Sequence, residues 1–361
     1  MFSTKHYVPI LKWKRAEQGA LSALTEDQKN RITPLIQLVM PKYKPSDQLE
    51  DVVASFEKQA LRIPEKLIEV WGRTPIFIDV SLLFTSPLKA KSIKIIGRGG
   101  QKQGGIFIPV LHLNDDQEIK NAAYSLAKET KGGLCLRLVC SDFSDPNKLN
   151  QIITNILSVS NVEEKNIDLL VDIKETEENG NKCTKYLRLS QGIPHLQKWR
   201  TFIFASGSFP ENLSQYKIDE ENLIPRIDWQ SWKQYVNGKT LKRTPAFGDY
   251  AIQHPVYKES SQFYHPTTSI KYTLEKEWLI MKGKQRAFEL YLASAAELVK
   301  DNRFYGKKFS NGDDYIVEKA NHFTTYIKDR SVKGTGSTET WLKAGINHHL
   351  AVVAHQIANL S

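Results

Sequence analysis

Cysteine is scarce in this chain, and long apolar runs are missing. Three cysteines occur among 361 residues, at positions 135, 140 and 183, so disulfide bonds do not define the fold and free thiols in a reducing compartment are expected. The first 15 residues, MFSTKHYVPILKWKR, contain no apolar run as long as that of a signal peptide, and no segment is long enough to span a bilayer. We therefore predict a cytoplasmic protein without a membrane partner.

Several motifs that define enzyme and metal-binding classes are also absent. No GxGxxG follows the first apolar run, which disfavours a dinucleotide-binding fold, and neither HExxH nor a zinc-binding pattern occurs. Ser206-Gly207-Ser208 lacks the GxSxG pattern of a nucleophile elbow. The Gly-rich basic segment over 94–105, KIIGRGGQKQGG, lacks the GK[ST] ending of a P-loop. We interpret this segment as a flexible surface hairpin, with a mobile phosphate-contacting loop as the alternative.

Basic residues outnumber acidic ones. The 50 Lys and Arg residues against 40 Asp and Glu give a formal net charge of +10, spread along the chain without a polybasic tail. This excess favours a phosphate-bearing partner, either nucleic acid or a nucleotide. It does not require one, because many basic proteins bind no anion.

Short apolar, β-branched runs recur eight times, with polar turns and helix-like segments between them. The runs cover residues 7–13, 32–39, 75–83, 105–113, 133–140, 167–173, 200–209 and 245–252. Near-continuous apolar character indicates parallel strands that are covered on both faces. Helical periodicity predicts helices over 47–72, 115–130 and 145–159, the last with Asp145 and Pro146 at its start. We predict a TIM-type (β/α)8 barrel, with an open doubly wound sheet as the alternative.

The pattern changes after residue 268. Alternating character over 269–283 predicts a strand or hairpin, and helices are expected over 286–302, 313–330 and 341–360. We therefore divide the chain into a barrel over 1–268 and a C-terminal extension over 269–361 that packs on it.

Charged residues at the predicted strand ends are the candidates for a site. In a barrel, functional side chains gather at the C-terminal ends of the strands. Lys12, Lys14, Arg137 and Lys282 are expected to converge there and bind a phosphate, with ordinary solvated lysines as the alternative.

Three aspartates interrupt or end apolar runs. Asp79 and Asp172 lie inside the runs IFIDVS and LLVDIK, and Asp249 belongs to the eighth run. A buried carboxylate is costly unless it is paired or binds a cation, so these groups could orient the lysines, hold a divalent metal or act as acid and base. The alternative is a structural salt bridge, for instance of Asp172 with Lys12 or Arg137.

Specific combinations of residues resemble the Beta protein family, which is named after a satellite-phage protein. They are the opening YVPILKWKRAEQGALSAL…RITPLIQL, FGDYAIQHP over 247–255, and W-x-x-x-G-I-N-H-H over 341–349. The resemblance extends from residue 7 to residue 358 and implies association with mobile elements and with phage-defence or toxin–antitoxin-like loci. It transfers no catalytic role. The matching positions are Lys12, Trp13, Lys14, Gly248, Asp249, Tyr250, Trp341, His348 and His349.

Three functions remain open from the sequence. The leading hypothesis is a component of an antiphage system whose barrel mouth binds nucleic acid or a nucleotide. The second is an interaction or antitoxin subunit that binds a protein encoded in the same locus and performs no chemistry. The third is a metal-dependent hydrolase that uses the three aspartates with His112 or His254.

Overall fold

Eight parallel strands close into a barrel in which β1 pairs with β2 on one side and with β9 on the other. The structure is a computed structural model that describes residues 5–218, 220–238, 241–258, 267–331 and 333–360. All eight apolar runs form barrel strands, which confirms the predicted (β/α)8 barrel. The strands are β1 (Tyr7–Lys12), β2 (Leu35–Gln37), β3 (Ile76–Asp79), β4 (Phe107–His112), β5 (Leu134–Val139), β6 (Ile167–Glu175), β7 (Thr201–Gly207) and β9 (Ala246–Asp249).

The interior of the barrel is filled by alternate residues of these strands, because successive side chains of a strand point to opposite faces. Every barrel strand contributes one or two residues to the interior apolar cluster, such as Val8 and Ile10 of β1 and Ile108 and Val110 of β4. The intervening residues face outward into a larger cluster between the strands and the surrounding helices. Burial on both faces explains why the runs are apolar almost throughout.

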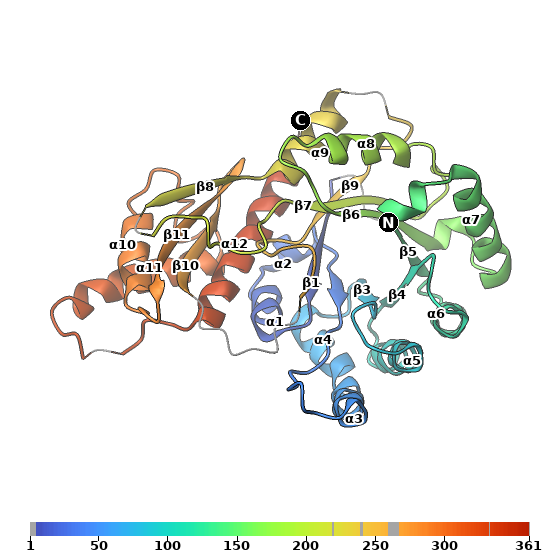
Figure 1. Cartoon of the computed structure of the whole chain (residues 1–361), viewed down its shortest axis with the longest axis horizontal. Helices are drawn as coiled ribbons and strands as arrows, with labels where there is room; N and C mark the ends of the chain where they lie inside the picture. The colour runs from blue at the N-terminus through green and yellow to red at the C-terminus, as the bar shows by residue number, and fades with distance from the viewer. Residues whose placement is uncertain (1–4, 219, 239–240, 259–266, 332, 361) are drawn as a thin grey trace.

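Helices surround the barrel, as Figure 1 shows. They are α1 (Arg15–Ser22), α2 (Glu26–Lys29), α3 (Leu49–Ala60), α4 (Ile63–Trp71), α5 (Ser86–Lys102), α6 (Gln117–Thr130), α7 (Pro146–Ser160), α8 (Asn181–Ser190) and α9 (Ile227–Gly238), with short 3-10 turns η1 (Cys140–Phe143) and η2 (Glu164–Asn166). The single helix expected over 47–72 is divided in two, with Pro64 in the first turn of α4. Asp145 caps α7 as predicted, since its side chain accepts hydrogen bonds from the amides of Asn147 and Lys148.

The prediction of a surface hairpin over 94–105 is wrong, because most of this segment belongs to α5. Its glycines permit close packing in place of a loop. A Cβ on Gly97 would lie 2.1 Å from a carbon of Leu126, and one on Gly100 would lie 2.3 Å from the ring of Phe107. Glycine is therefore needed here so that α5 can approach α6 and β4.

The C-terminal part adds a three-stranded antiparallel sheet and three helices beside the barrel (Figure 1). β10 (Thr267–Thr273) and β11 (Glu277–Gln285) form the expected hairpin. The third strand, β8 (Glu221–Pro225), comes from between β7 and β9 and pairs with β11. The helices are α10 (Leu290–Leu298), α11 (Asn311–Tyr326) and α12 (Thr338–Ala358). Sequence periodicity missed β8, whose residues are mostly exposed.

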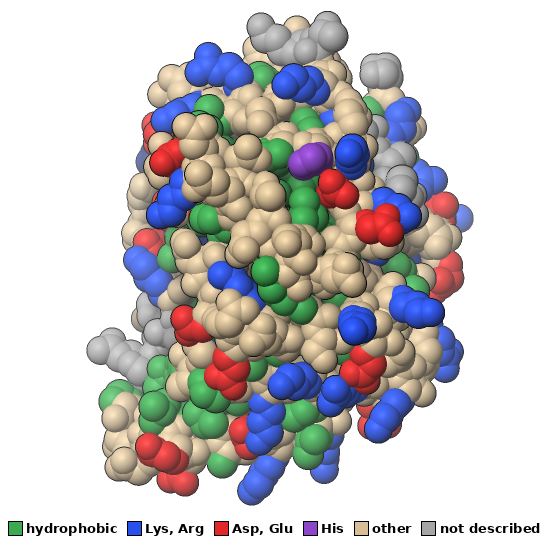
Figure 2. All heavy atoms as spheres, turned by 90° about the vertical axis from the view of Figure 1, so that its right-hand side faces the viewer, with side chains coloured by type: hydrophobic (Ala, Val, Ile, Leu, Met, Phe, Trp, Pro, Cys, Tyr) green, Lys and Arg blue, Asp and Glu red, His purple; other side chains and the backbone are tan. Residues whose placement is uncertain are grey.

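Positive and negative charges are mixed on the face of the molecule that Figure 2 shows. Figure 2 shows one face on which Lys and Arg side chains alternate with Asp and Glu and form no single continuous patch. Among the described residues, no helix is both long enough and apolar enough to cross a membrane. A site for an anionic partner must therefore be sought in local geometry, and the mouth of the barrel is where that geometry is found.

Candidate functional site at the mouth of the barrel

Polar side chains replace apolar ones at the last interior position of most barrel strands. In β1 the interior residues Val8 and Ile10 are followed by Lys12, and in β5 the interior residue Cys135 is followed by Arg137. Gln37, Asp79, His112, Asp172 and Tyr250 hold the corresponding positions in or directly after β2, β3, β4, β6 and β9. The alternation of the strands thus forms one polar layer at the C-terminal mouth, where barrels place their functional groups.

Arg137 is the centre of this layer and is fully buried. Its guanidinium donates to Asp79 from Nη1, and to Asp172 Oδ2 from Nε (3.1 Å) and from Nη2 (2.6 Å). The hydroxyl of Tyr250 accepts from Nη2 (2.9 Å) and donates to Asp172 Oδ2 (2.7 Å). Gln37 donates to Asp79 Oδ2 (3.2 Å). One buried cation therefore joins both carboxylates, which corresponds to the structural salt bridge that the sequence left open for Asp172.

The pKa values of the two carboxyl groups follow from this arrangement. Burial raises the pKa of Asp79, but Arg137 and then His112 outweigh this effect and hold it well below its usual range. Burial likewise opposes ionisation of Asp172, while Lys174 and Arg137 lower its pKa below the usual range. Both aspartates are thus anionic partners of cations, which disfavours a role as proton carriers near neutral pH.

A second layer of cations lies above the buried one. Lys12 is buried and donates to the carbonyl oxygen of His254 (3.2 Å), and its Nζ lies 5.8 Å from the ring centroids of both Tyr250 and Tyr257. The Nζ atom of Lys14 lies 4.5 Å from the Tyr257 ring, and that of Lys174 lies 5.3 Å from the Tyr250 ring. We call Lys12, Lys14 and Lys174 the mouth lysines.

Burial and mutual repulsion act on two of the mouth lysines. Burial lowers the pKa of Lys12 to about 8, although the nearby Glu17 carboxyl raises it, and Lys174 and Lys14 lower it further. Burial also lowers the pKa of Lys174, against the opposing effect of Asp172, which lies 3.4 Å from its Nζ. An anion placed among these ammonium groups would relieve their repulsion and stabilise their charged form.

Backbone geometry contributes to the site after β1 and at the end of β6. α1 begins at Arg15, directly after Lys14, and no side chain caps it. The amide groups of a helix N-terminus attract anions, so this end of α1 adds to the positive field of the mouth. At the end of β6 an irregular register places Lys174 with φ 59°, a left-handed conformation that a lysine rarely adopts. Such conformations cluster at functional sites and also occur at helix ends, as at Lys131 after α6.

Asp249 does not join Asp79 and Asp172, contrary to the prediction. Tyr250 faces the barrel interior, so the preceding residue faces outward. The Asp249 carboxylate accepts a hydrogen bond from Tyr7, and its Oδ2 lies 2.9 Å from Nε2 of His349 on α12. His349 Nδ1 lies 2.9 Å from Thr273 Oγ1 on β10. Asp249 and His349 therefore join the barrel to the extension.

His348 and Trp341 also lie in the extension, away from the mouth. Nδ1 of His348 lies 2.9 Å from Asp313 Oδ2, Nε2 lies 2.9 Å from the carbonyl oxygen of Thr273, and the ring stacks on Tyr272 at 3.9 Å. Trp341 stacks on Tyr291 at 4.8 Å and donates to the carbonyl of Thr335 (3.0 Å). Trp341 and His348 of the W-x-x-x-G-I-N-H-H motif thus anchor α12 in the extension, while His349 of the same motif joins it to the barrel.

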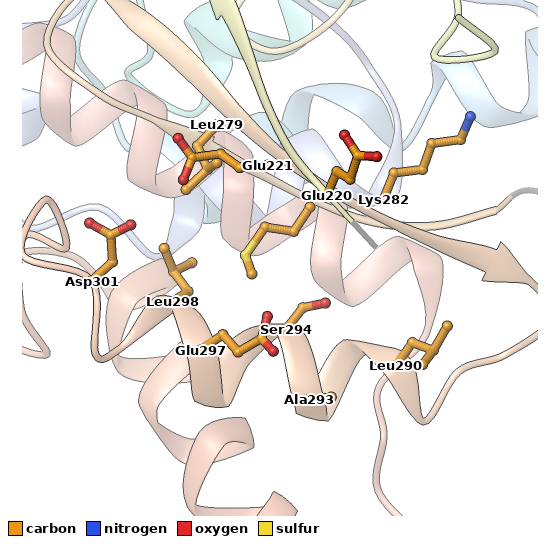
Figure 3. Close-up of a pocket in the computed structure, with 11 residues that line it drawn as sticks. Glu220, Glu221, Leu279, Lys282, Leu290, Ala293, Ser294, Glu297, Leu298 and Asp301 are labelled. Atoms are coloured by element: carbon orange, nitrogen blue, oxygen red, sulfur yellow. The ribbon is translucent and has the colours of Figure 1, made fainter. Parts of the chain in front are cut away.

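The expected convergence is also wrong for Lys282. It lies on β11 and donates to the carbonyl oxygens of Leu213 (2.7 Å) and Tyr216 (2.8 Å) in the loop after β7. Figure 3 shows its side chain extending away from Glu297 and Asp301 at a groove of about 410 Å³ between β11 and α10. The hairpin that carries Lys282 belongs to the second sheet, so the barrel rule does not apply to it. The acidic lining of this groove has the wrong sign for a phosphate.

The remaining candidates lie near the mouth or beneath it. His254 Nε2 lies 3.2 Å from Glu175 Oε1, and the His254 carbonyl holds Lys12. Trp13 is half-buried against the core.

Sequence reasoning missed Gln37 and Tyr257, because neither is a charged residue at the end of an apolar run. Among the described residues, no cluster of three His, Cys, Asp or Glu side chains has the geometry of a metal site.

Comparison with known proteins agrees with the resemblance seen in the sequence. The chain is 22% identical to Protein beta of Enterobacteria phage P4, over 97% of this chain and 93% of the phage protein. The family model described as Beta protein matches residues 7–355, which include every barrel strand and most of α12. The chain therefore belongs to the Beta protein family.

Proposed function

We propose that the mouth of the barrel binds a phosphate-bearing ligand, either a nucleotide or a nucleic acid. The observation that carries this proposal is the convergence of the three mouth lysines on the rings of Tyr250 and Tyr257, beside the uncapped start of α1. Lysines and a helix N-terminus are a recurrent combination for phosphate groups. The ring of Tyr257, which is half-buried, adds a surface on which a base can stack.

The buried layer supports the same ligand class. Arg137 balances one of the two negative charges of Asp79 and Asp172, and Lys174, whose Nζ lies 3.4 Å from Asp172, balances the other. Lys12 donates to the carbonyl oxygen of His254 and has no ion pair within 4.0 Å among the described residues. The net charge of +10 adds a favourable long-range field for an anionic ligand.

The wider role that we propose is in antiphage defence in the cytoplasm, together with a protein encoded in the same locus. Membership of a family that includes a protein of phage P4 supports an association with mobile elements. Co-purification of the tagged chain from cells that carry its native locus tests the partner. Recovery of no product of a neighbouring gene would contradict this part of the proposal.

A second candidate is an interaction subunit that performs no chemistry. The observation that favours it is the Asp79–Arg137–Asp172 pairing, which leaves these carboxylates occupied. The hydrolase hypothesis is less favoured, because Asp249 faces away from the other two aspartates and both of these are paired with Arg137. Only the phosphate-binding barrel predicts a ligand at the mouth whose affinity falls with increasing salt. This measurement therefore separates the two functions.

A binding titration tests the proposal. The affinity for a short fluorescent single-stranded RNA and for a nucleoside triphosphate is measured at about 50 and about 200 mM salt. Three lysine contacts predict a loss of RNA affinity of at least roughly tenfold between these conditions. The double substitution Lys14→Ala/Lys174→Ala should weaken binding of whichever ligand is bound by about tenfold or more at low salt.

The matched control removes two surface lysines far from the mouth. Lys66→Ala/Lys91→Ala changes the net charge equally and breaks two exposed ion pairs, with Glu69 and with Glu57. Its effect on affinity should be less than about twofold. Absence of binding by both ligands at low salt, or equal losses in the two double variants, would refute a phosphate site at the mouth.

A further inference from the structure

Glu17 is a buried carboxyl group at the mouth that the phosphate-binding proposal does not use. It lies in the first turn of α1, with 1% of its surface exposed. Its Oε1 accepts a hydrogen bond from Gln253 Nε2 (2.8 Å). Its Oε2 is buried and has no hydrogen-bond partner among the described residues. An unpaired buried carboxylate oxygen is costly, so this atom requires an explanation.

Glu17 lies beside the mouth lysines. Gln253, which binds Glu17, is followed by His254, whose carbonyl accepts from Lys12 (3.2 Å), so one short turn after β9 holds both groups. Glu17 contributes to the electrostatic environment of Lys12, and Lys14 and Lys12 contribute to that of Glu17. No ion pair within 4.0 Å joins Glu17 to Lys12 among the described residues, so Glu17 Oε2 is not paired with this lysine.

Opposing effects act on the pKa of Glu17. Burial raises its pKa, against the lowering effects of Gln253, its own amide group and the two lysines. A carboxyl oxygen of this kind accepts a hydrogen bond from a hydroxyl or amino group and repels a phosphate oxygen. The mouth thus presents a cationic region for a phosphate next to an acceptor for a neutral donor.

We propose that the ligand of the mouth is a phosphorylated sugar, either free or as the ribose phosphate of a nucleotide, whose hydroxyl group donates to Glu17 Oε2. This inference rests on the proposed phosphate site and specifies the group attached to the phosphate, which is a sugar with a free hydroxyl. The phosphate contacts the mouth lysines and the start of α1, and the sugar hydroxyl completes the hydrogen bonding of Glu17. Glu17 is a specificity residue in this arrangement, because it distinguishes ligands that share the phosphate and differ in the hydroxyl.

Two small probes separate these contributions. Ribose 5-phosphate and methyl phosphate are both phosphomonoesters, but only the first carries sugar hydroxyls. Calorimetric titration of the full chain should show ribose 5-phosphate binding about tenfold more tightly, since a hydrogen bond to a charged acceptor discriminates by roughly that factor. Glu17→Gln should remove most of this preference and leave the affinity for methyl phosphate equal or higher, because it removes a negative charge near the phosphate.

Controls keep the outcomes distinct. Glu69→Gln removes an exposed carboxylate on α4 and should change neither affinity. Equal affinity of the wild-type chain for both probes would overturn the inference while leaving the phosphate site intact, and so would an equal loss of both affinities in Glu17→Gln. If thermal unfolding shows that Glu17→Gln is poorly folded, the comparison of the two probes on the wild-type chain still tests the inference. Failure of both probes to bind would overturn the phosphate site and the inference together.

Discussion

Arg137 and Asp172 lie on the neighbouring strands β5 and β6 and are joined by two hydrogen bonds, 3.1 Å from Nε and 2.6 Å from Nη2 to the same carboxylate oxygen. Both side chains are fully buried. The same guanidinium binds Asp79 on β3, so one residue links opposite parts of the mouth. This link makes the polar layer a fixed floor on which the mouth lysines are arranged.

Removal of Arg137 should therefore strongly destabilise the protein. Arg137→Met leaves Asp79 and Asp172 buried without their guanidinium partner, with Lys174 alone beside Asp172, and breaking a buried pair in this way costs about 3–5 kcal/mol. The free energy of unfolding is measured in urea. Arg98→Met, which breaks an exposed pair with Glu129, should cost less than about 1 kcal/mol. A loss below about 1 kcal/mol in Arg137→Met would show that the floor does not depend on this residue.

Stability should change with pH through Asp228, at the start of α9. Burial and the nearby Asp249 raise its pKa to about 6, above the value near 4 expected in the unfolded chain. The folded state thus binds the proton more tightly, so this contribution is fully present below about pH 4 and is lost as the pH rises through about 6. Relative to Asp228→Asn, the wild-type chain should be more stable at pH 4 than at pH 7 by about 2 kcal/mol in urea unfolding. A difference independent of pH would contradict the raised pKa.

Phosphate affinity should fall as the pH rises through about 8. The pKa of Lys12 is lowered to about 8 by burial, so its ammonium group loses its charge in that range, where the other mouth lysines repel it. Calorimetric titration with sulfate, a phosphate-like anion whose charge is constant between about pH 6.5 and 9.5, measures this effect, and the bound anion will move the midpoint upward. Lys12→Met should abolish the fall, whereas Lys14→Met should weaken binding and retain it. A fall that persists in Lys12→Met would assign the titration to another group.

Helix α5 should tolerate no side chain at Gly100. Alanine stabilises an ordinary helix position by about 1 kcal/mol relative to glycine, but a Cβ here would lie 2.3 Å from the ring of Phe107. Gly100→Ala should therefore lower the free energy of unfolding by about 1–3 kcal/mol. In Gly238→Ala, where no atom lies within 4 Å of the new Cβ, stability should be unchanged or slightly higher. A stabilised Gly100→Ala would show that α5 does not pack as tightly as described.

The barrel could be predicted because its strands are buried on both faces and leave a continuous apolar signal. All eight were located, whereas β8 was missed because an exposed edge strand carries no such signal. The glycines of α5 were mistaken for a loop, since their role depends on Leu126 and Phe107, which come from other elements.

The mouth was predicted only in part. Lys12, Asp79, Arg137 and Asp172 follow from strand ends and period-two alternation. The same alternation, applied strictly to Asp249 and Tyr250, would have placed Asp249 outside. The position of Lys282 depends on which sheet includes β11, and the position of Glu17 depends on how α1 packs. Neither can be predicted from a local sequence pattern.

The most direct test of a phosphate site at the mouth is a crystal structure of the protein soaked with tungstate, a phosphate mimic whose heavy atom is located by anomalous scattering. We predict a tungstate ion at the start of α1, within hydrogen-bonding distance of Lys12 or Lys14, that is lost in Lys12→Met/Lys14→Met crystals. Tungstate bound only elsewhere on the surface, with the mouth empty at saturating concentration, would contradict the account.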